Sequence, residues 1–485
     1  MLLDADTCYR AFAARDARFD GVFFVAVETT GIYCRPVCRA RTPGRDRCVF
    51  YRTAAEAERA AFRACFRCRP ELAPGLGPVD AVSRLSAAAA RQIDAGFLNE
   101  SSVDDLAAQL GVSSRHLRRS MLAELGVSPV DLAQARRLAL AKQLLHDTAL
   151  PLADVAFASG FSSLRRFNAV FQERFARPPS ALRREVGGTA EGSGAITLRL
   201  DLRPPFDWDA LLAFLAGRAI PGVEAIDGET YRRTVRLGDR TGLIAVRRDA
   251  RRHGLVAEVS LSLAGALMPL SARLRALFDL DAHPEAVAAQ LRGDPDLAPL
   301  VKERPGLRVP GAFDPFETTV RTVLGQQVSV RAATTLGARL AAALGERTVT
   351  PFSDLHHLSV TPEAVARAGE PAIAALGMPG ARARAVVAVA RAFASGALRL
   401  ARSGDPEAAR AELVALPGIC PWTVEYLSMR ALGWPDAFPA SDLVLCRALG
   451  GVTPGRAIER ARAWRPFRSY AVMHLWTHAA RGATT

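Results

Sequence analysis

The alternation of apolar and polar positions divides the chain into helical and strand-like stretches. Residues 79–184 are rich in helix formers and carry apolar residues at helical spacing. Between residues 196 and 281, "ITLRLDLRPPFDW" alternates as a strand does, and "RRTVRLGDRTGLIAVRRD" predicts two strands across a glycine-containing turn. Helical periodicity returns from residue 283, and capping residues predict helices that begin near Asp314, Pro362, Asp405, Pro421 and Asp442.

Two stretches of proline, glycine and small residues mark domain boundaries. They are "PELAPGLGP" at residues 70–78 and "VGGTAEGSGA" at residues 186–195. A chain of 485 residues is too long for one hydrophobic core, so we expect a multidomain protein, mainly α with smaller α+β parts. The predicted parts are residues 1–75, residues 80–184, a linker at 185–195, an α+β subdomain at 196–282 and an all-α domain at 283–485.

The composition describes a basic protein with ordinary apolar content. Its net charge is +14, and Lys142 and Lys302 are its two lysines among 63 basic residues. This charge favours an anionic partner such as nucleic acid, and arginine suits bidentate phosphate contacts, although a GC-rich genome also favours arginine codons. We find no signal peptide and no run of about 18 apolar residues that could cross a membrane, so we expect a cytoplasmic protein without a membrane partner.

Six of the eight cysteines lie within the first 68 residues. Four of them form two close pairs, Cys34-x3-Cys38 and Cys65-x2-Cys68, and two such pairs can surround one tetrahedral Zn²⁺ with four thiolates. In a reducing cytosol this clustering favours a metal over disulfides. The spacing alone favours a structural zinc that holds a small domain together.

The sequence around the pairs resembles a known zinc domain. "FDGVFFVAVETTGIYCRPVCRAR" (19–41) and "AAFRACFRC" (60–68) resemble the N-terminal domain of the Ada family of alkylation-response proteins. The resemblance implies that Cys34, a ligand of one catalytic and structural zinc, also accepts methyl groups from methylphosphotriesters in DNA. Methylation would reduce the net negative charge of the centre from two units to one, which should raise DNA affinity. The resemblance also implies contacts with the DNA backbone by four residues, Thr30, Arg39, Arg41 and Arg63; the alternative is that they form a solvated basic face. We expect Cys8 and Cys48 to be buried small residues outside the metal site.

The second part contains two predicted helix-turn-helix motifs. "SVDDLAAQLGVSSRHLRRSMLAELG" (102–126) gives a helix, a Gly111 turn, a Ser113 cap and a basic second helix. "LADVAFASGFSSLRRFNAVFQERFARPPSALRR" (152–184) resembles the distal half of the AraC-type DNA-binding domain. We expect the phenylalanines Phe157, Phe161, Phe167 and Phe171 to pack in the core. The predicted DNA contacts are Ser114, Arg115, Arg118, Ser163, Arg165 and Arg166.

The last part carries a predicted hairpin between helices. Residues 416–420, "LPGIC", resemble the helix-hairpin-helix turn, where Gly418 allows a tight bend and a following helix N-terminus meets a phosphate. Cys420 stands where a second glycine is usual. Together with "FDPFETTVRTVLGQQVSV" (313–330), Asp442 and "WRPFRSYAVMHLW" (464–476), the hairpin resembles the AlkA branch of helix-hairpin-helix glycosylases, the type II 3-methyladenine glycosylases.

That resemblance assigns roles to a few side chains. Asp442 would stabilise the cationic sugar as the N-glycosidic bond breaks; its alternative is a helix N-cap, and both roles can coexist. Trp422, Tyr426 and Trp476 would stack on an everted cationic purine, with ordinary core packing as the alternative. Gln326 would lie at this base pocket, and Gln327 at the gap in the DNA. Trp422 stands where strand-cutting relatives carry a lysine, so we expect a monofunctional enzyme.

The combined prediction is a DNA alkylation repair protein: a zinc methyl acceptor, an AraC-like DNA-binding module and a DNA-3-methyladenine glycosylase II. The expected partner is double-stranded DNA, both alkylated and at promoters; RNA polymerase is a further candidate, and we expect a monomer. The methylguanine-transferase domain of Ada, with its Pro-Cys-His-Arg motif, is not found in this sequence. The chief alternative is a methylation-activated transcription factor whose glycosylase-like half only binds DNA. A third possibility is a zinc-containing DNA-binding protein without thiol chemistry.

Overall fold

The fold is described from a computed structural model, which describes residues 3–77, 82–186 and 195–482. The chain forms two compact units. The first comprises residues 1–204 with 237–242 and 249–272, and the second comprises residues 205–236, 243–248 and 273–485. Among the described residues, no helix is long and apolar enough to cross a membrane.

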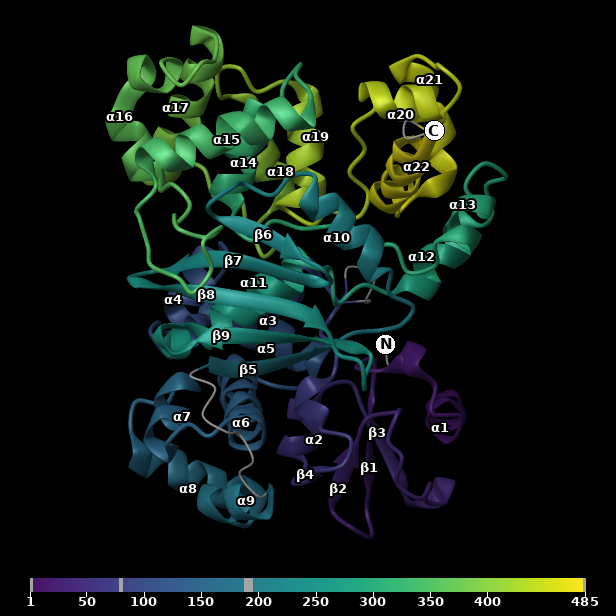
Figure 1. The fold of residues 1–485 in the computed structure, drawn as a ribbon. Helices are drawn as coiled ribbons and strands as arrows, with labels where there is room; N and C mark the ends of the chain where they lie inside the picture. Colours follow the sequence, from purple (N-terminus) through teal and green to yellow (C-terminus); the bar gives the residue numbers. More distant parts are fainter. Residues whose placement is uncertain (1–2, 78–81, 187–194, 483–485) are drawn as a thin grey trace. The chain divides into compact units, whose positions relative to one another are not determined.

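The N-terminal part is a small four-stranded sheet with two helices, drawn in purple in Figure 1. The strand order is β3-β1-β2-β4. Strand β1 pairs antiparallel with β2 and β3, and β2 pairs parallel with β4. Buried Phe12, Phe23 and Val25 pack with the six N-terminal cysteines to form its core. The elements are α1 (Ala5–Ala13), β1 (Phe24–Val27), β2 (Ile32–Cys34), β3 (Cys48–Tyr51), α2 (Ala54–Arg59) and β4 (Arg63–Ala64).

Seven helices follow within the described residues 82–186, and both predicted helix-turn-helix motifs are present. Gly111 and Gly160 provide the left-handed turn residues, at φ +70° and +83°. Ser113 and Ser163 cap the second helix of each motif, because each hydroxyl accepts a hydrogen bond from the backbone N–H three residues on. The helices are α3 (Arg84–Asp94), α4 (Val103–Gln109), α5 (Ser114–Leu125), α6 (Pro129–Asp147), α7 (Leu152–Ala158), α8 (Leu164–Phe175) and α9 (Pro179–Val186).

The phenylalanine core of the second motif is confirmed with one correction. Phe161, Phe167 and Phe171 are at most 5% exposed, but Phe157 is 55% exposed. Helix α7 spans only two turns and buries Val155, Ala156 and Ala158, which leaves Phe157 on its open face. The expectation of core packing for Phe157 is therefore wrong.

Residues 187–194, which make up most of the predicted linker, lie outside the described residues. A five-stranded sheet follows them in the chain. Its strand order is β5-β9-β8-β7-β6. The predicted strands are confirmed as β5, β7 and β8, with Gly238 in the turn between the last two at φ +61°. The elements are β5 (Ala195–Asp201), α10 (Trp208–Ala216), β6 (Glu224–Asp227), β7 (Thr230–Leu237), β8 (Arg240–Arg248), β9 (Gly254–Ser260) and α11 (Leu267–Leu277).

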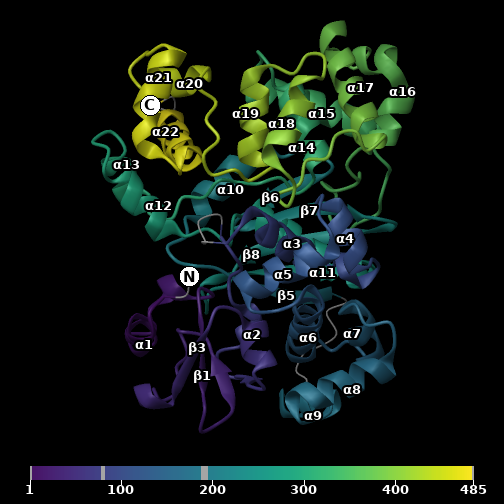
Figure 2. The same ribbon diagram turned by 180° about the vertical axis from the view of Figure 1, so that it is seen from behind.

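The second unit is completed by helices, and the five predicted helix starts are confirmed. Asp314, Asp405 and Asp442 are N-caps, and Pro362 and Pro421 are first residues of their helices. Helices α16 and α17 pack side by side, as do α20 and α22 (Figure 2). The helices are α12 (Pro284–Leu291), α13 (Ala298–Glu303), α14 (Pro315–Leu324), α15 (Val330–Leu344), α16 (Pro362–Ala374), α17 (Gly380–Ala394), α18 (Pro406–Val414), α19 (Pro421–Arg430), α20 (Leu443–Ala448), α21 (Pro454–Arg460) and α22 (Arg468–Gly482).

Candidate functional site

Strand register brings the two cysteine pairs together. In the parallel pair of β2 and β4, Tyr33 lies opposite Ala64, so the next residues, Cys34 and Cys65, leave the sheet side by side. A hydrogen bond from the Cys65 N–H to the Tyr33 carbonyl, at 3.0 Å, extends this pairing. Tight turns then return Cys38 and Cys68 toward the same point.

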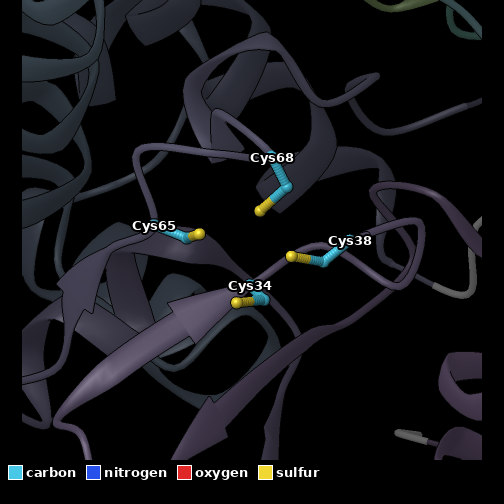
Figure 3. Close-up of side chains that lie close together, drawn as sticks. All are labelled: Cys34, Cys38, Cys65 and Cys68. Atoms are coloured by element: carbon cyan, nitrogen blue, oxygen red, sulfur yellow. The ribbon is translucent and has the colours of Figure 1, made fainter. Parts of the chain in front are cut away.

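The four sulfur atoms form one cluster. They lie within 4.8 Å of one another, and all four side chains are buried and face a common centre (Figure 3). Hydrogen bonds among the sulfurs lower the pKa of Cys38 to about 7 and raise that of Cys34. A dication at their centre would displace the thiol protons, and four convergent thiolates suit Zn²⁺. The predicted ligand set fits one zinc ion.

The other two N-terminal cysteines do not join this cluster. Cys8 is fully buried and its thiol hydrogen-bonds the Leu3 carbonyl; Cys48 is 6% exposed and its thiol hydrogen-bonds the Gly44 carbonyl. Burial raises the pKa of Cys8 to about 11. The expectation of two buried small residues outside the metal site is confirmed.

The side chains predicted to contact DNA in the first unit are accessible. Thr30 lies in the turn between β1 and β2, and the backbone N–H of Arg63 donates to Gly31 in that turn. In the helix-turn-helix motifs, the predicted residues lie on α5 and α8 or cap α8. Exposed residues of the predicted set are Thr30, Arg39, Arg41, Arg63, Arg115, Arg118, Ser163, Arg165 and Arg166, and Ser114 is half-buried.

In the second unit, the hairpin between α18 and α19 has the predicted geometry. Gly418 adopts φ +78°, and a Cβ there would lie 2.7 Å from the Ala385 Cβ, so both conformation and space require glycine. Cys420 has an ordinary extended backbone and an exposed side chain, so the hairpin accommodates it without strain. The Gln326 amide donates to the Gly418 carbonyl at 2.9 Å and to the Thr423 hydroxyl at 3.0 Å, which ties α14 to the hairpin.

Asp442 is held by three hydrogen bonds. Its Oδ2 accepts from the Trp422 indole N–H at 3.0 Å. Its Oδ1 accepts from the Trp476 indole N–H at 3.0 Å and from the backbone N–H of Leu445 at 2.8 Å, which makes Asp442 the N-cap of α20. The capping role and the contact with the predicted aromatic residues therefore coexist in one half-buried carboxylate.

The three predicted aromatic residues lie together around Asp442. Trp422 stacks on Tyr426 with ring centroids 5.2 Å apart and an interplanar angle of 21°, and Tyr426 lies 6.0 Å from Trp476. All three side chains are half-buried, whereas the core tryptophans Trp208 and Trp464 are at most 2% exposed. Their partial exposure departs from ordinary core packing.

Sequence reasoning missed a guanidinium group behind this aromatic cluster. Arg430 is 6% exposed, and its Nη1 donates to the Tyr426 hydroxyl at 2.6 Å. Burial works to raise the pKa of Tyr426, but Arg430, Arg218 and Arg321 outweigh it and lower that pKa. The only sign of this contact in the sequence is that Arg430 follows Tyr426 by four residues, a spacing that puts two side chains on the same face of a helix.

Three further residues considered in the sequence analysis are Gln327 and the two lysines. Gln327 is exposed between α14 and α15 at φ +55°, a conformation rare for residues other than glycine. Lys142 is buried in the other unit, and Lys302 is exposed on α13. Trp422 lies in the first turn of α19, and its indole N–H donates to Asp442.

Four family models match successive parts of the chain. They are the metal binding domain of Ada at residues 7–71, a helix-turn-helix domain at 106–185, the AlkA N-terminal domain at 197–314, and the HhH-GPD superfamily base excision DNA repair protein at 320–461. Their order defines a modular protein in which metal-binding and helix-turn-helix parts precede a helix-hairpin-helix glycosylase fold.

One relative matches nearly the whole chain. A probable bifunctional transcriptional activator/DNA repair enzyme AlkA of Mycobacterium tuberculosis is 42% identical over 98% of this chain and 96% of its own length. The chain belongs to this family of bifunctional AlkA proteins. The DNA-3-methyladenine glycosylase 2 of Escherichia coli is 37% identical, covering 57% of this chain and 95% of that protein. A solved 3-methyladenine DNA-glycosylase from Archaeoglobus fulgidus shares the fold over 58% of this chain and 98% of its own, with a TM-score of 0.51 and 22% identity.

Proposed function

We propose that the second unit is a monofunctional DNA glycosylase that excises alkylated purines such as 3-methyladenine. The observation that carries the proposal is the Asp442 carboxylate, fixed by two indole N–H groups beside stacked aromatic rings. When the bond between C1′ and the purine nitrogen breaks, its electron pair leaves with the base and the sugar becomes cationic. A fixed carboxylate beside C1′ stabilises that cation until water adds and releases a proton.

The aromatic cluster supplies the selection of damaged bases. An N-alkylated purine carries positive charge, so it stacks more favourably on electron-rich indole and phenol rings than a normal purine does. Trp422, Tyr426 and Trp476 therefore form the base pocket in this proposal, and Gln326 braces it through the hairpin. Gly418 and Cys420 place the N-terminus of α19 against a DNA phosphate, and Gln327 fills the gap that the everted nucleotide leaves. Because Trp422 occupies the lysine position, the enzyme releases the base without cutting the strand.

The first unit adds a methyl acceptor in this proposal. The Cys34 sulfur attacks the methyl group of a methylphosphotriester, a carbon–sulfur bond forms, and the carbon–oxygen bond breaks so that the phosphodiester leaves as an anion. Zinc, when bound, keeps the four thiols deprotonated and so supplies the nucleophile. Thr30, Arg39, Arg41 and Arg63 are exposed, and they bind the DNA backbone during the transfer.

The helix-turn-helix motifs make the methyl acceptor a regulator of transcription. In this proposal the residues that meet DNA grooves at promoters are Ser114, Arg115 and Arg118 on α5, and Ser163, Arg165 and Arg166 at α8. The protein acts as a cytoplasmic monomer in this proposal, and RNA polymerase is the candidate partner at promoters.

One incubation with methylated duplex DNA tests both chemistries. The proposal expects free 3-methyladenine in solution, intact DNA strands with abasic sites, and a peptide containing Cys34 heavier by one methyl group. Release of no base, with DNA binding retained, would support the alternative of a transcription factor whose glycosylase-like half only binds DNA. Loss of phosphotriesters without a heavier Cys34 peptide would refute the acceptor assignment.

A further inference from the structure

A buried arginine directly follows the first metal ligand. Arg35 is 3% exposed, and its guanidinium pairs with two carboxylates, Asp20 and Asp201, the latter at 2.7 Å. Asp201 is the last residue of β5, which belongs to the strand-rich subdomain, 166 residues further along the chain. The backbone N–H of Arg35 donates to the Cys68 sulfur at 3.4 Å. One residue therefore connects the metal ligands to the end of β5.

The second ligand loop makes equivalent contacts with helix α6. Lys142 is 1% exposed, and its ammonium group donates to the Cys65 carbonyl at 3.3 Å and to the Glu71 carboxylate at 2.8 Å. Arg69, the residue after Cys68, pairs with Glu71 at 2.9 Å and with Asp147, the last residue of α6, at 2.8 Å.

An aromatic ring and a second strand contact reinforce this arrangement. Phe66 lies between the ligands Cys65 and Cys68. The centroid of its ring is 4.7 Å from the Lys142 ammonium nitrogen and 4.4 Å from the central carbon of the Arg177 guanidinium. The Gln143 amide on α6 donates to the Arg199 carbonyl on β5 at 3.0 Å. A chain of buried and part-buried contacts within the first unit thus joins the first ligand loop to β5, β5 to α6, and α6 to the second ligand loop.

Buried charges make these contacts depend on one another. An ion removed from water is destabilising unless a partner of opposite charge remains in place, so removal of one partner is strongly destabilising. If the ligand loops lost their fold, Arg35 and Arg69 would leave Asp201 and Asp147 with fewer cations. Asp147 lies at the C-terminus of α6, where the helix dipole already disfavours an anion.

We infer that the four-cysteine centre is also an intramolecular docking site, whose partners are the acidic end of β5 and the C-terminal half of α6. Metal binding fixes the two loops that carry Arg35, Phe66 and Arg69, and these side chains fix β5 and α6. By thermodynamic linkage, an intact β5 contact in turn strengthens metal binding. The methyl acceptor, the helix-turn-helix module and strand β5, all within the first unit, therefore form one metal-dependent body. The inference rests on zinc occupying the site, which the zinc content of the purified protein tests separately.

Hydrogen exchange on the full-length protein tests the docking. Removal of zinc with a chelator should increase amide exchange at least about fivefold, the lower end of typical coupling, in Ala195–Asp201 and in residues 140–147. Helix α17, in the other unit, serves as the internal control and should be unchanged. A rise confined to residues 3–77 would overturn the inference.

A distant substitution tests the same linkage from the other side. Asp201→Asn removes one buried partner of Arg35 and touches no cysteine, so zinc affinity, measured by competition with a chromogenic chelator, should fall about tenfold. Asp239→Asn is the matched control, because Asp239 is exposed in the turn between β7 and β8. Equal zinc affinity in the two variants would overturn the inference. A purified protein without zinc would overturn both the inference and the proposed cofactor.

Discussion

We predict that the two indole N–H groups that donate to Asp442 contribute a measurable part of the glycosylase rate. Trp422 and Trp476 each donate at 3.0 Å, and they bind opposite oxygens of the carboxylate. A hydrogen bond to a charged group contributes about 1.5–3 kcal/mol, and half-burial of Asp442 places these bonds near the lower end. Trp422→Phe and Trp476→Phe keep an aromatic ring but lose the donor. Each should therefore slow the chemical step about tenfold.

Single-turnover release of 3-methyladenine from methylated duplex DNA measures that step. The double variant should lose up to about a hundredfold, because the two bonds hold different oxygens of one carboxylate. Trp434→Phe is the matched control: its ring packs under Arg410 and lies outside the aromatic cluster, so the rate should be unchanged. Rates within twofold of the wild type in both single variants and the double variant would refute a positioning role for the indoles.

Three further predictions concern stability. Ala176 ends α8 at φ +54°, so Ala176→Gly should raise stability by about 0.5–1 kcal/mol in urea unfolding, whereas Ala169→Gly inside α8 should lower it by about 1 kcal/mol. Burial lowers the pKa of His474 to about 4, below the ordinary 6.5, so between these pH values the unfolded chain binds a proton that the folded chain does not. The free energy of unfolding should therefore fall by about 3 kcal/mol as the pH drops from 6.5 to 4. His474→Gln should remove that fall. Gly418→Ala should destabilise the protein by about 1–2 kcal/mol or more and weaken DNA binding, while Gly455→Ala, inside α21 with open space around it, should lower neither stability nor DNA affinity, as urea unfolding and DNA titration will show.

Local signals in the sequence predicted much of the fold. Caps such as Asp314 and Asp405 fix where helices begin, and alternation over residues 196–201 identified β5, because both signals act within a few residues. The fold class, the zinc-binding cysteines and the order of the modules are confirmed. The exact domain boundaries and the roles of individual site residues stay predictions.

Contacts distant in sequence were not predictable in this way. Phe157 fits the apolar spacing of α7, but its exposure depends on which face of a two-turn helix meets the core. Arg35 and Lys142 carry no local sign of burial, because their carboxylate partners are distant in the chain. Cys420 stands where a second glycine is usual, and whether a side chain fits there depends on the backbone conformation, which at a φ of −92° suits any residue.

The most direct test of the central claim is single-turnover base release by Asp442→Asn beside Asp405→Asn. Asparagine caps a helix as well as aspartate does, and Asp405 caps α18 as Asp442 caps α20, so the pair separates loss of charge from loss of a cap. Our account predicts that release of 3-methyladenine falls at least about a hundredfold in Asp442→Asn, with affinity for abasic DNA retained, and stays at the wild-type rate in Asp405→Asn. Equal release by Asp442→Asn and the wild type would contradict it.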